Sequence, residues 1–127
     1  MKTKLFQNNI IAKKSTIHGY GVFAGKDLKK GEMIEECHFV FSHCKDKVIF
    51  DFIFDVKGRL ALLFGYGSLY NHSDKPNADY DFNIKSRIAT FKADRVIKKG
   101  EEIFISYGDE WFGSRNRKKK APRKQKI

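Results

Sequence analysis

Glycine-centred turns divide this chain into short apolar segments, and this spacing constrains the fold more than any other feature. Runs rich in aliphatic and aromatic residues, bounded by such turns, are typical of β-strands. No segment has the periodicity of a long helix. The sequence therefore predicts a mainly β fold of several small sheets with short helical turns, and we expect strands at residues 10–12, 22–24, 33–41, 80–82, 87–91 and 103–105. Residues 46–56 are ambiguous, but Phe50, Phe52 and Phe54 would share one side of a strand, which favours β structure.

The stretch from Leu60 to Tyr80 stands at the centre of this pattern. An apolar run at 60–64 leads into Gly65-Tyr66-Gly67 and then into three adjacent polar side chains, Asn71-His72-Ser73. Polar groups beside a core need hydrogen-bond partners. Two interpretations are open from these residues alone: an ordinary surface turn, or one part of a site that the two ends of the chain complete.

Length and composition indicate a single packed domain. A chain of 127 residues can bury its own core, and 12 Phe and 5 Tyr predict an aromatic-rich interior. Apolar runs of about 18 residues, which a spanning helix needs, are absent. The first residues lack the apolar stretch of a secretory signal. We therefore expect an intracellular protein without a membrane segment. Cys37 and Cys44 lack the paired spacing of a zinc site or a disulfide framework, so we expect no metal.

Positive charge is concentrated at the C-terminal end. The net charge is +11, yet residues 1–114 carry 18 basic and 15 acidic side chains. The remaining basic residues lie in a tail without any acid: Arg115, Arg117, Lys118, Lys119, Lys120, Arg123, Lys124 and Lys126. Such a tail is expected to be a disordered arm, which either binds nucleic acid or another polyanion, serves as a nuclear address, or only keeps the protein soluble.

Three separated motifs resemble those of the SET-domain protein lysine methyltransferases. They are His18-Gly19-Tyr20-Gly21-Val22-Phe23-Ala24, then Tyr70-Asn71-His72-Ser73 with Pro76-Asn77, and finally Gly100-Glu101-Glu102-Ile103 leading to Ser106-Tyr107-Gly108. Their order and spacing agree with the family. The short length, the lack of cysteine-rich flanking modules and the Ser-Tyr-Gly-Asp ending most resemble the small viral and bacterial members. On this basis we expect a lead-in at 1–9, a SET domain at 10–114 and the basic tail at 115–127.

The resemblance implies a fold of small, mostly antiparallel sheets in which the C-terminal segment threads under the Asn-His-Ser loop as a pseudoknot. It implies S-adenosylmethionine as methyl donor on one face and a lysine entering through a narrow channel from the other. The implied cofactor-binding residues are Gly19, Tyr20, Gly21, Asn71 and His72, and the His72 ring is expected to be structural. The implied catalytic residue is Tyr107, whose hydroxyl would lie where the sulfonium methyl meets the lysine nitrogen.

The lysine channel is expected to be lined by apolar and aromatic side chains, whose faces attract cationic groups. Tyr80 matches a family position on the lysine path, and Ile105 occupies the position that helps to set the number of methyl groups added. Phe52 and Trp111 are further channel candidates, and Trp111 with Phe112 would cap the site unless a second copy of the chain does so. The small viral relatives imply such a homodimer.

The resemblance implies a protein lysine as substrate, with a histone tail favoured over a non-histone protein. The sequence leaves the target lysine, the degree of methylation, and a nuclear or cytoplasmic location open. Two alternatives belong to other classes: a catalytically silent SET-fold module that binds proteins, and a nucleic-acid-binding protein that acts through its tail. Retention of Asn71, His72 and Tyr107 favours the enzyme.

Overall fold

Strands and turns make up the described part of the chain. The computed structural model describes residues 4–43 and 52–107. Its strands are β1 (Ile10–Lys14), β2 (Tyr20–Ala24), β3 (Met33–Phe41), β4 (Ile53–Val56), β5 (Arg59–Leu63), β6 (Asn71–His72), β7 (Ala78–Asn83), β8 (Ile88–Ala93) and β9 (Glu102–Ile105). The mainly β prediction is confirmed. The described residues contain no helix, so the expected short helical turns have no counterpart there, and no described helix could span a membrane.

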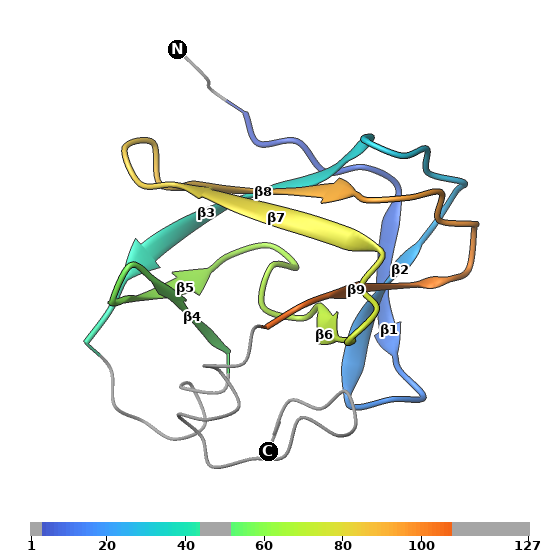
Figure 1. The fold of residues 1–127 in the computed structure, drawn as a ribbon, viewed down its shortest axis with the longest axis horizontal. Helices are drawn as coiled ribbons and strands as arrows, with labels where there is room; N and C mark the ends of the chain where they lie inside the picture. Colours follow the sequence, from blue (N-terminus) through green and yellow to red (C-terminus); the bar gives the residue numbers. More distant parts are fainter. Residues whose placement is uncertain (1–3, 44–51, 108–127) are drawn as a thin grey trace.

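The strands form two sheets. One has the order β1-β2-β9-β6, and the other has the order β4-β5-β3-β8-β7. All neighbouring strands are antiparallel except β6 and β9, which are parallel. In Figure 1, β3, β8 and β7 lie along the upper side of the molecule. Strands β1 and β2 run roughly across the direction of β7 and β8 at the right, and β9 passes through the middle. The last described strand is therefore an inner strand, inserted between two earlier parts of the chain.

The core lies between these sheets and is rich in aromatic side chains, as the composition predicts. Phe39, Tyr70 and Phe91 are fully buried, and the Tyr70 and Phe91 rings stack with their centroids 4.5 Å apart. In β7, residues 78, 80 and 82 turn toward the core while 79, 81 and 83 are exposed, which is the alternation of a strand with one buried face. Burial of this face fixes the register of β7 against β8.

A Lys-Lys-Gly-Glu sequence that occurs twice makes the same turn twice. In the first copy the Lys29 N–H donates to the Glu32 carboxylate over 3.0 Å, and the Glu32 N–H donates back to the Lys29 carbonyl over 2.9 Å. Gly31 adopts a φ of 85°. Glycine reaches this conformation without the steric cost of a side chain. The second copy repeats the reciprocal bonds between Lys98 and Glu101.

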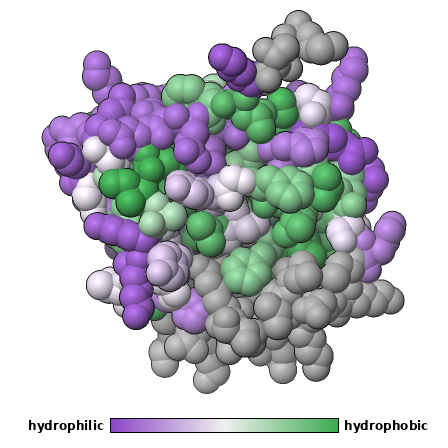
Figure 2. Space-filling model, turned by 180° about the vertical axis from the view of Figure 1, so that it is seen from behind, coloured by the Kyte–Doolittle hydropathy of each residue, from purple (hydrophilic) through white to green (hydrophobic). Residues whose placement is uncertain are grey.

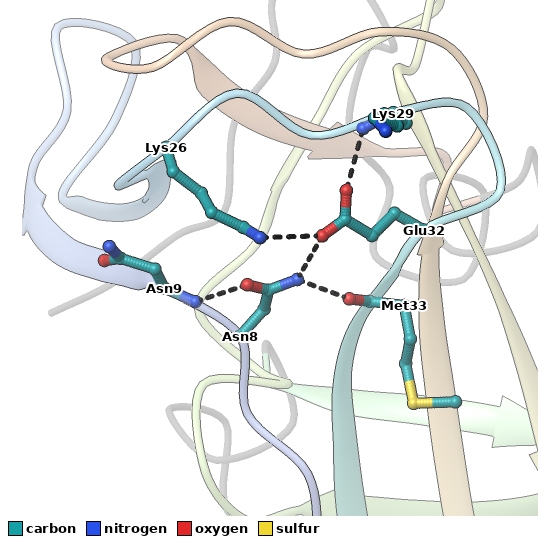
Figure 3. Close-up of polar contacts among 6 residues, drawn as sticks. All are labelled: Asn8, Asn9, Lys26, Lys29, Glu32 and Met33. Carbon is teal, nitrogen blue, oxygen red and sulfur yellow. Dashed lines mark hydrogen bonds and ion pairs between the residues drawn. The ribbon is translucent and has the colours of Figure 1, made fainter.

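Glu32 also holds the N-terminal segment against this turn. Its carboxylate accepts a hydrogen bond from the Asn8 amide and forms an ion pair with Lys26, both at 3.0 Å (Figure 3). The Lys29 N–H, then the Asn8 amide and then Lys26 lower the pKa of Glu32 to about 2, because each of them favours the charged carboxylate. The turn thus stabilises the packing of residue 8 against β3.

The β structure that we favoured for the ambiguous segment is confirmed for Ile53–Val56, which form β4. Phe52, which we expected on the same strand, lies in the turn before β4, and residues 44–51, with Cys44 and Phe50, lie outside the described residues. Asn71 and His72 do not form a plain turn, since they make the short parallel strand β6. A two-residue strand leaves no periodicity in the sequence, so it could not be predicted there.

The surface combines strongly polar with apolar regions. On the face opposite to that of Figure 1, apolar side chains gather in the middle and hydrophilic side chains lie above them and to both sides (Figure 2). The large apolar side chains exposed over the described residues include Ile11, Tyr20, Phe64 and Val96. Phe64 ends the apolar run at 60–64, in which Ala61 and Leu63 are buried, so that run is buried only in part.

Candidate functional site

Strand β9 brings the three motifs into one sheet. Its residues pair on one side with β2, where Phe23 lies opposite Glu102, and on the other side with β6, where Asn71 lies opposite Phe104. Asn77 fastens this arrangement, because its amide donates to the Glu102 carbonyl over 2.9 Å and accepts the Phe104 N–H over 2.8 Å. The C-terminal segment therefore lies against the Asn-His segment, as the expected fold requires.

Asn71 carries a buried side-chain oxygen beside these strands. Its amide nitrogen donates to the His18 carbonyl over 3.1 Å and to the Glu102 carboxylate over 2.8 Å. Both partners are acceptors, so they fix which end of the amide is nitrogen. The Asn71 Oδ1 accepts no hydrogen bond from any described residue. A buried acceptor normally has a partner, so this open oxygen marks a position where a ligand donor would bind.

Glu102 holds Asn71 and was not predicted as a site residue. Besides the Asn71 amide, its carboxylate accepts the Ser15 hydroxyl over 2.7 Å. Gly21 makes room for this pair: a Cβ at residue 21 would lie 2.9 Å from the Asn71 amide nitrogen and well inside contact distance of the Glu102 carboxylate. The sequence signal for Glu102 was its place as the second acid of Gly-Glu-Glu at the start of an apolar strand, where a carboxylate needs a partner.

Gly19 and Tyr20 lie at the turn between β1 and β2. Gly19 has a φ of 51°, and its carbonyl accepts the Ser15 N–H over 2.7 Å. Tyr20 is the first residue of β2 and is 56% exposed. Because the neighbouring His18 carbonyl accepts the Asn71 amide, this turn lies beside the open Asn71 oxygen. The expected cofactor-binding residues of the first two motifs are therefore close to one another.

Tyr107 is held at both ends. Its backbone N–H donates to His72 Nδ1 over 2.9 Å, and its hydroxyl donates to the Tyr70 carbonyl over 2.6 Å. Since His72 Nδ1 accepts from an amide, the imidazole proton is on Nε2. That nitrogen lies 2.9 Å from the Asp74 carboxylate. The hydrogen-bond network thus assigns a neutral His72 whose ring positions Tyr107.

The candidate channel residues occupy different surroundings. The Tyr80 hydroxyl donates to the Ser106 carbonyl over 2.8 Å, which places Tyr80 next to the Tyr107 segment. Burial, and after it the Asp79 charge, raises the pKa of Tyr80 to about 12, so the phenol is neutral at physiological pH. Ile105 is fully buried in the core, and the Phe52 carbonyl accepts the Ser68 hydroxyl over 2.9 Å.

The remaining expectations concern residues outside the described part. These are Trp111 and Phe112 as channel or capping residues and the basic tail from Arg115 to Lys126. The structure describes the C-terminal motif as far as Tyr107.

Comparisons with known proteins agree with this geometry. The SET domain family matches residues 19–108. A Schizosaccharomyces pombe histone-lysine N-methyltransferase, H3 lysine-37 specific, is 37% identical over 57 residues, which are 44% of this chain and 39% of the relative. The Arabidopsis thaliana histone-lysine N-methyltransferase MEDEA is 30% identical over 121 residues, which are 81% of this chain and 17% of the relative. The chain thus spans well under half the length of these curated relatives.

A solved structure extends the likeness across most of the chain. It is the crystal structure of a Plasmodium falciparum protein described as a candidate histone methyltransferase, with a TM-score of 0.73 and 36% sequence identity. The match covers 84% of this chain and 99% of that one.

Proposed function

Because this chain belongs to the SET-domain family, we propose that it is a protein-lysine N-methyltransferase that uses S-adenosylmethionine. The observation that carries the proposal is the meeting of Asn71, His72 and Tyr107 around β9. Asn71 and His72 belong to one motif and Tyr107 to another much later in the sequence, and each is fixed by hydrogen bonds.

The polar groups around Asn71 fit the amino acid portion of this cofactor. The open Asn71 Oδ1 would accept a hydrogen bond from its ammonium group, and the Glu102 carboxylate beside it adds a favourable negative charge. Gly19, Tyr20 and the His72 backbone would complete the cofactor-binding surface. When bound, S-adenosylmethionine supplies a methyl group activated by a positively charged sulfur.

The role proposed for Tyr107 is to orient the reacting groups. Its hydroxyl proton is committed to the Tyr70 carbonyl, so its oxygen meets a substrate as a hydrogen-bond acceptor. An acceptor at this point would align the lysine amine with the methyl group. Positioning of this kind contributes strongly to catalysis, because a reaction between two bound groups needs one geometry.

The lysine must reach the site as a neutral amine. A free lysine has a pKa of about 10.4, and desolvation beside a positive sulfur lowers it. We propose that the neutral Tyr80 hydroxyl, Ile105, Phe52 and Trp111 surround the lysine side chain, and that the proton leaves to solvent. Whether one or more methyl groups are added depends on the room left around the amine.

We propose a histone tail as the substrate and chromatin as the place of action. Both curated relatives are named as histone-lysine methyltransferases, which supports this class of substrate. The basic tail would then hold the enzyme on a polyanion such as nucleosomal DNA. The resemblance to the small viral and bacterial members, and the homodimer that it implies, are part of the same proposal.

Transfer of labelled methyl groups tests the proposed function. The protein is incubated with labelled S-adenosylmethionine and core histones, and the modified lysine is located by mass spectrometry. We expect Tyr107→Phe to reduce transfer about a hundredfold or more, since orienting donors and acceptors at a reacting centre contribute about that much. Tyr66→Phe is the matched control, because it also removes one phenol oxygen and should retain activity. Equal activity in Tyr107→Phe and wild type would refute the assigned role.

A further inference from the structure

A buried carboxylate that plays no part in the proposed reaction lies beneath the site. Glu35, in β3, is only 1% exposed. Its Oε1 accepts the Tyr70 hydroxyl over 2.8 Å, and its Oε2 accepts the Gln7 amide and the Tyr66 backbone N–H, each over 3.0 Å. A buried charge is costly unless donors surround it, and here three donors do.

The charge of Glu35 is compatible with its neighbours. Burial first, and then the negative Glu35, raise the pKa of Tyr70 well above its usual range. The same two causes raise the pKa of the Cys37 thiol. Tyr70 and Cys37 therefore stay neutral, and the Tyr70 hydroxyl keeps the proton that it donates to the carboxylate.

The glycine turn that precedes the Asn-His motif is shaped around this carboxylate. Gly65 has a φ of 72°, and a Cβ at this residue would lie 2.7 Å from the Glu35 Oε2. The turn can thus approach closely enough for the Tyr66 N–H to donate. The Gly65-Tyr66-Gly67 turn of the sequence is therefore a loop that packs over the Glu35 carboxylate.

Tyr70 connects this carboxylate to Tyr107. Its ring is fully buried and stacks on Phe91, with the ring centroids 4.5 Å apart. Its hydroxyl is held by the hydrogen bond to Glu35. The carbonyl of the same residue accepts the Tyr107 hydroxyl over 2.6 Å. A side chain anchored in this way restrains its own backbone, and therefore the carbonyl.

We propose that Glu35 is a positioning residue that acts through Tyr70 to hold the carbonyl which orients the Tyr107 hydroxyl. The inference rests on the proposed function only for its effect on methyl transfer. The coupling from Glu35 to Tyr107 is a property of the folded chain, and it can be measured without substrate.

The test removes only the Tyr70 oxygen. Tyr70→Phe keeps the ring on Phe91 but breaks the bond to Glu35, and Tyr66→Phe removes a phenol oxygen from the same loop while its backbone N–H still reaches Glu35. In protein labelled with carbon-13 at the tyrosine ring carbon that bears oxygen, the Tyr107 NMR signal is assigned by its loss in Tyr107→Phe. We expect this signal to move in Tyr70→Phe and to stay in place in Tyr66→Phe.

Kinetics provide the second measurement. A shift of the acceptor by a fraction of an ångström should lower kcat about tenfold in Tyr70→Phe, because displacements near ~1 Å cost about a hundredfold. The KM for S-adenosylmethionine should remain within about twofold, since Asn71 and Glu102 are untouched. If Tyr70→Phe does not fold, Glu35→Gln replaces it, because the uncharged amide keeps the size of the side chain but is a weaker acceptor for the Tyr70 hydroxyl, and its NH2 group would face the Tyr66 N–H. The Tyr107 signal should then move as well.

The outcomes separate the two proposals. An unmoved Tyr107 signal with unchanged kcat in a folded variant overturns the role of Glu35. A signal that moves in a protein without any methyl transfer supports the coupling and refutes the proposed function instead.

Discussion

Replacing Gly21 by alanine should weaken cofactor binding far more than it weakens the fold. The new Cβ would overlap the Glu102 carboxylate. That carboxylate must then move by about 1 Å or more to reach ordinary contact distance. The Asn71–Glu102 hydrogen bond, now 2.8 Å long, would lengthen beyond the hydrogen-bonding range. Asn71 would lose one of the two acceptors that direct its open oxygen.

The expected loss of affinity follows from the changed direction of the Asn71 amide. If Asn71 turns away, the bound cofactor loses the proposed hydrogen bond from its ammonium group to the Asn71 Oδ1. A hydrogen bond to a charged group contributes about 1.5–3 kcal/mol, which corresponds to roughly a 10- to 100-fold loss of cofactor affinity. Stability should fall by only about 1 kcal/mol, because the carboxylate can rotate toward solvent and alanine restricts the unfolded chain. Isothermal titration calorimetry with S-adenosylhomocysteine measures the affinity, and urea unfolding measures the stability.

A double-mutant cycle identifies the cause. If Gly21→Ala acts by displacing the carboxylate, it should have little further effect on affinity in a Glu102→Ala background. The sequence had predicted a direct contact between Gly21 and the cofactor. An equal loss of affinity in both backgrounds would support that contact and refute the displacement of Glu102.

Three other predictions concern the frame of the site. The pKa of Glu32, about 2 in the fold, lies below its ordinary 4.5, so its ionised form stabilises the protein above pH 4.5 and this contribution disappears as the pH falls to 2. Calorimetry should show that Glu32→Gln lowers Tm at neutral pH and that the difference vanishes in acid. Gly31 has a positive φ, so Gly31→Ala should cost about 1–2 kcal/mol in urea unfolding because a side chain is strained there; an unchanged midpoint would contradict this. Asn77→Ala removes both side-chain bonds to β9. The free energy of unfolding should fall by about 1–3 kcal/mol, and amide hydrogen exchange in β9 should become faster. Exchange at the wild-type rate would contradict the role of Asn77 in holding β9.

Local patterns in the sequence predicted most of the strands. The loose alternation at 33–41 predicted a strand because the side-chain period of a strand is two, and the strand predicted at 80–82 lies within the observed Ala78–Asn83. The glycines at 31 and 100 mark turns because the chain takes a positive φ there. These signals act between neighbouring residues, so they can be read without knowledge of the fold.

The motifs also predicted which residues would meet. Asn71 and Tyr107 were expected at one site from their resemblance to a family, and in the structure Tyr107 is hydrogen-bonded to Tyr70 and His72, the two residues that flank Asn71 in the sequence. Their roles in binding and catalysis remain proposals. The resemblance identified these two residues, but it did not predict which atoms form the hydrogen bonds that hold them.

Tertiary structure alone decided the partners of the buried polar groups. Nothing near Glu35 in the sequence indicates that its carboxylate would meet Tyr70, and nothing near Glu102 indicates Asn71. A strand pattern tells which face is buried, but the order of strands in the sheets decides which distant side chain lies opposite. The insertion of β9 between β2 and β6 made both the Asn71 site and the Tyr107 anchor, because it placed one late segment against two early ones.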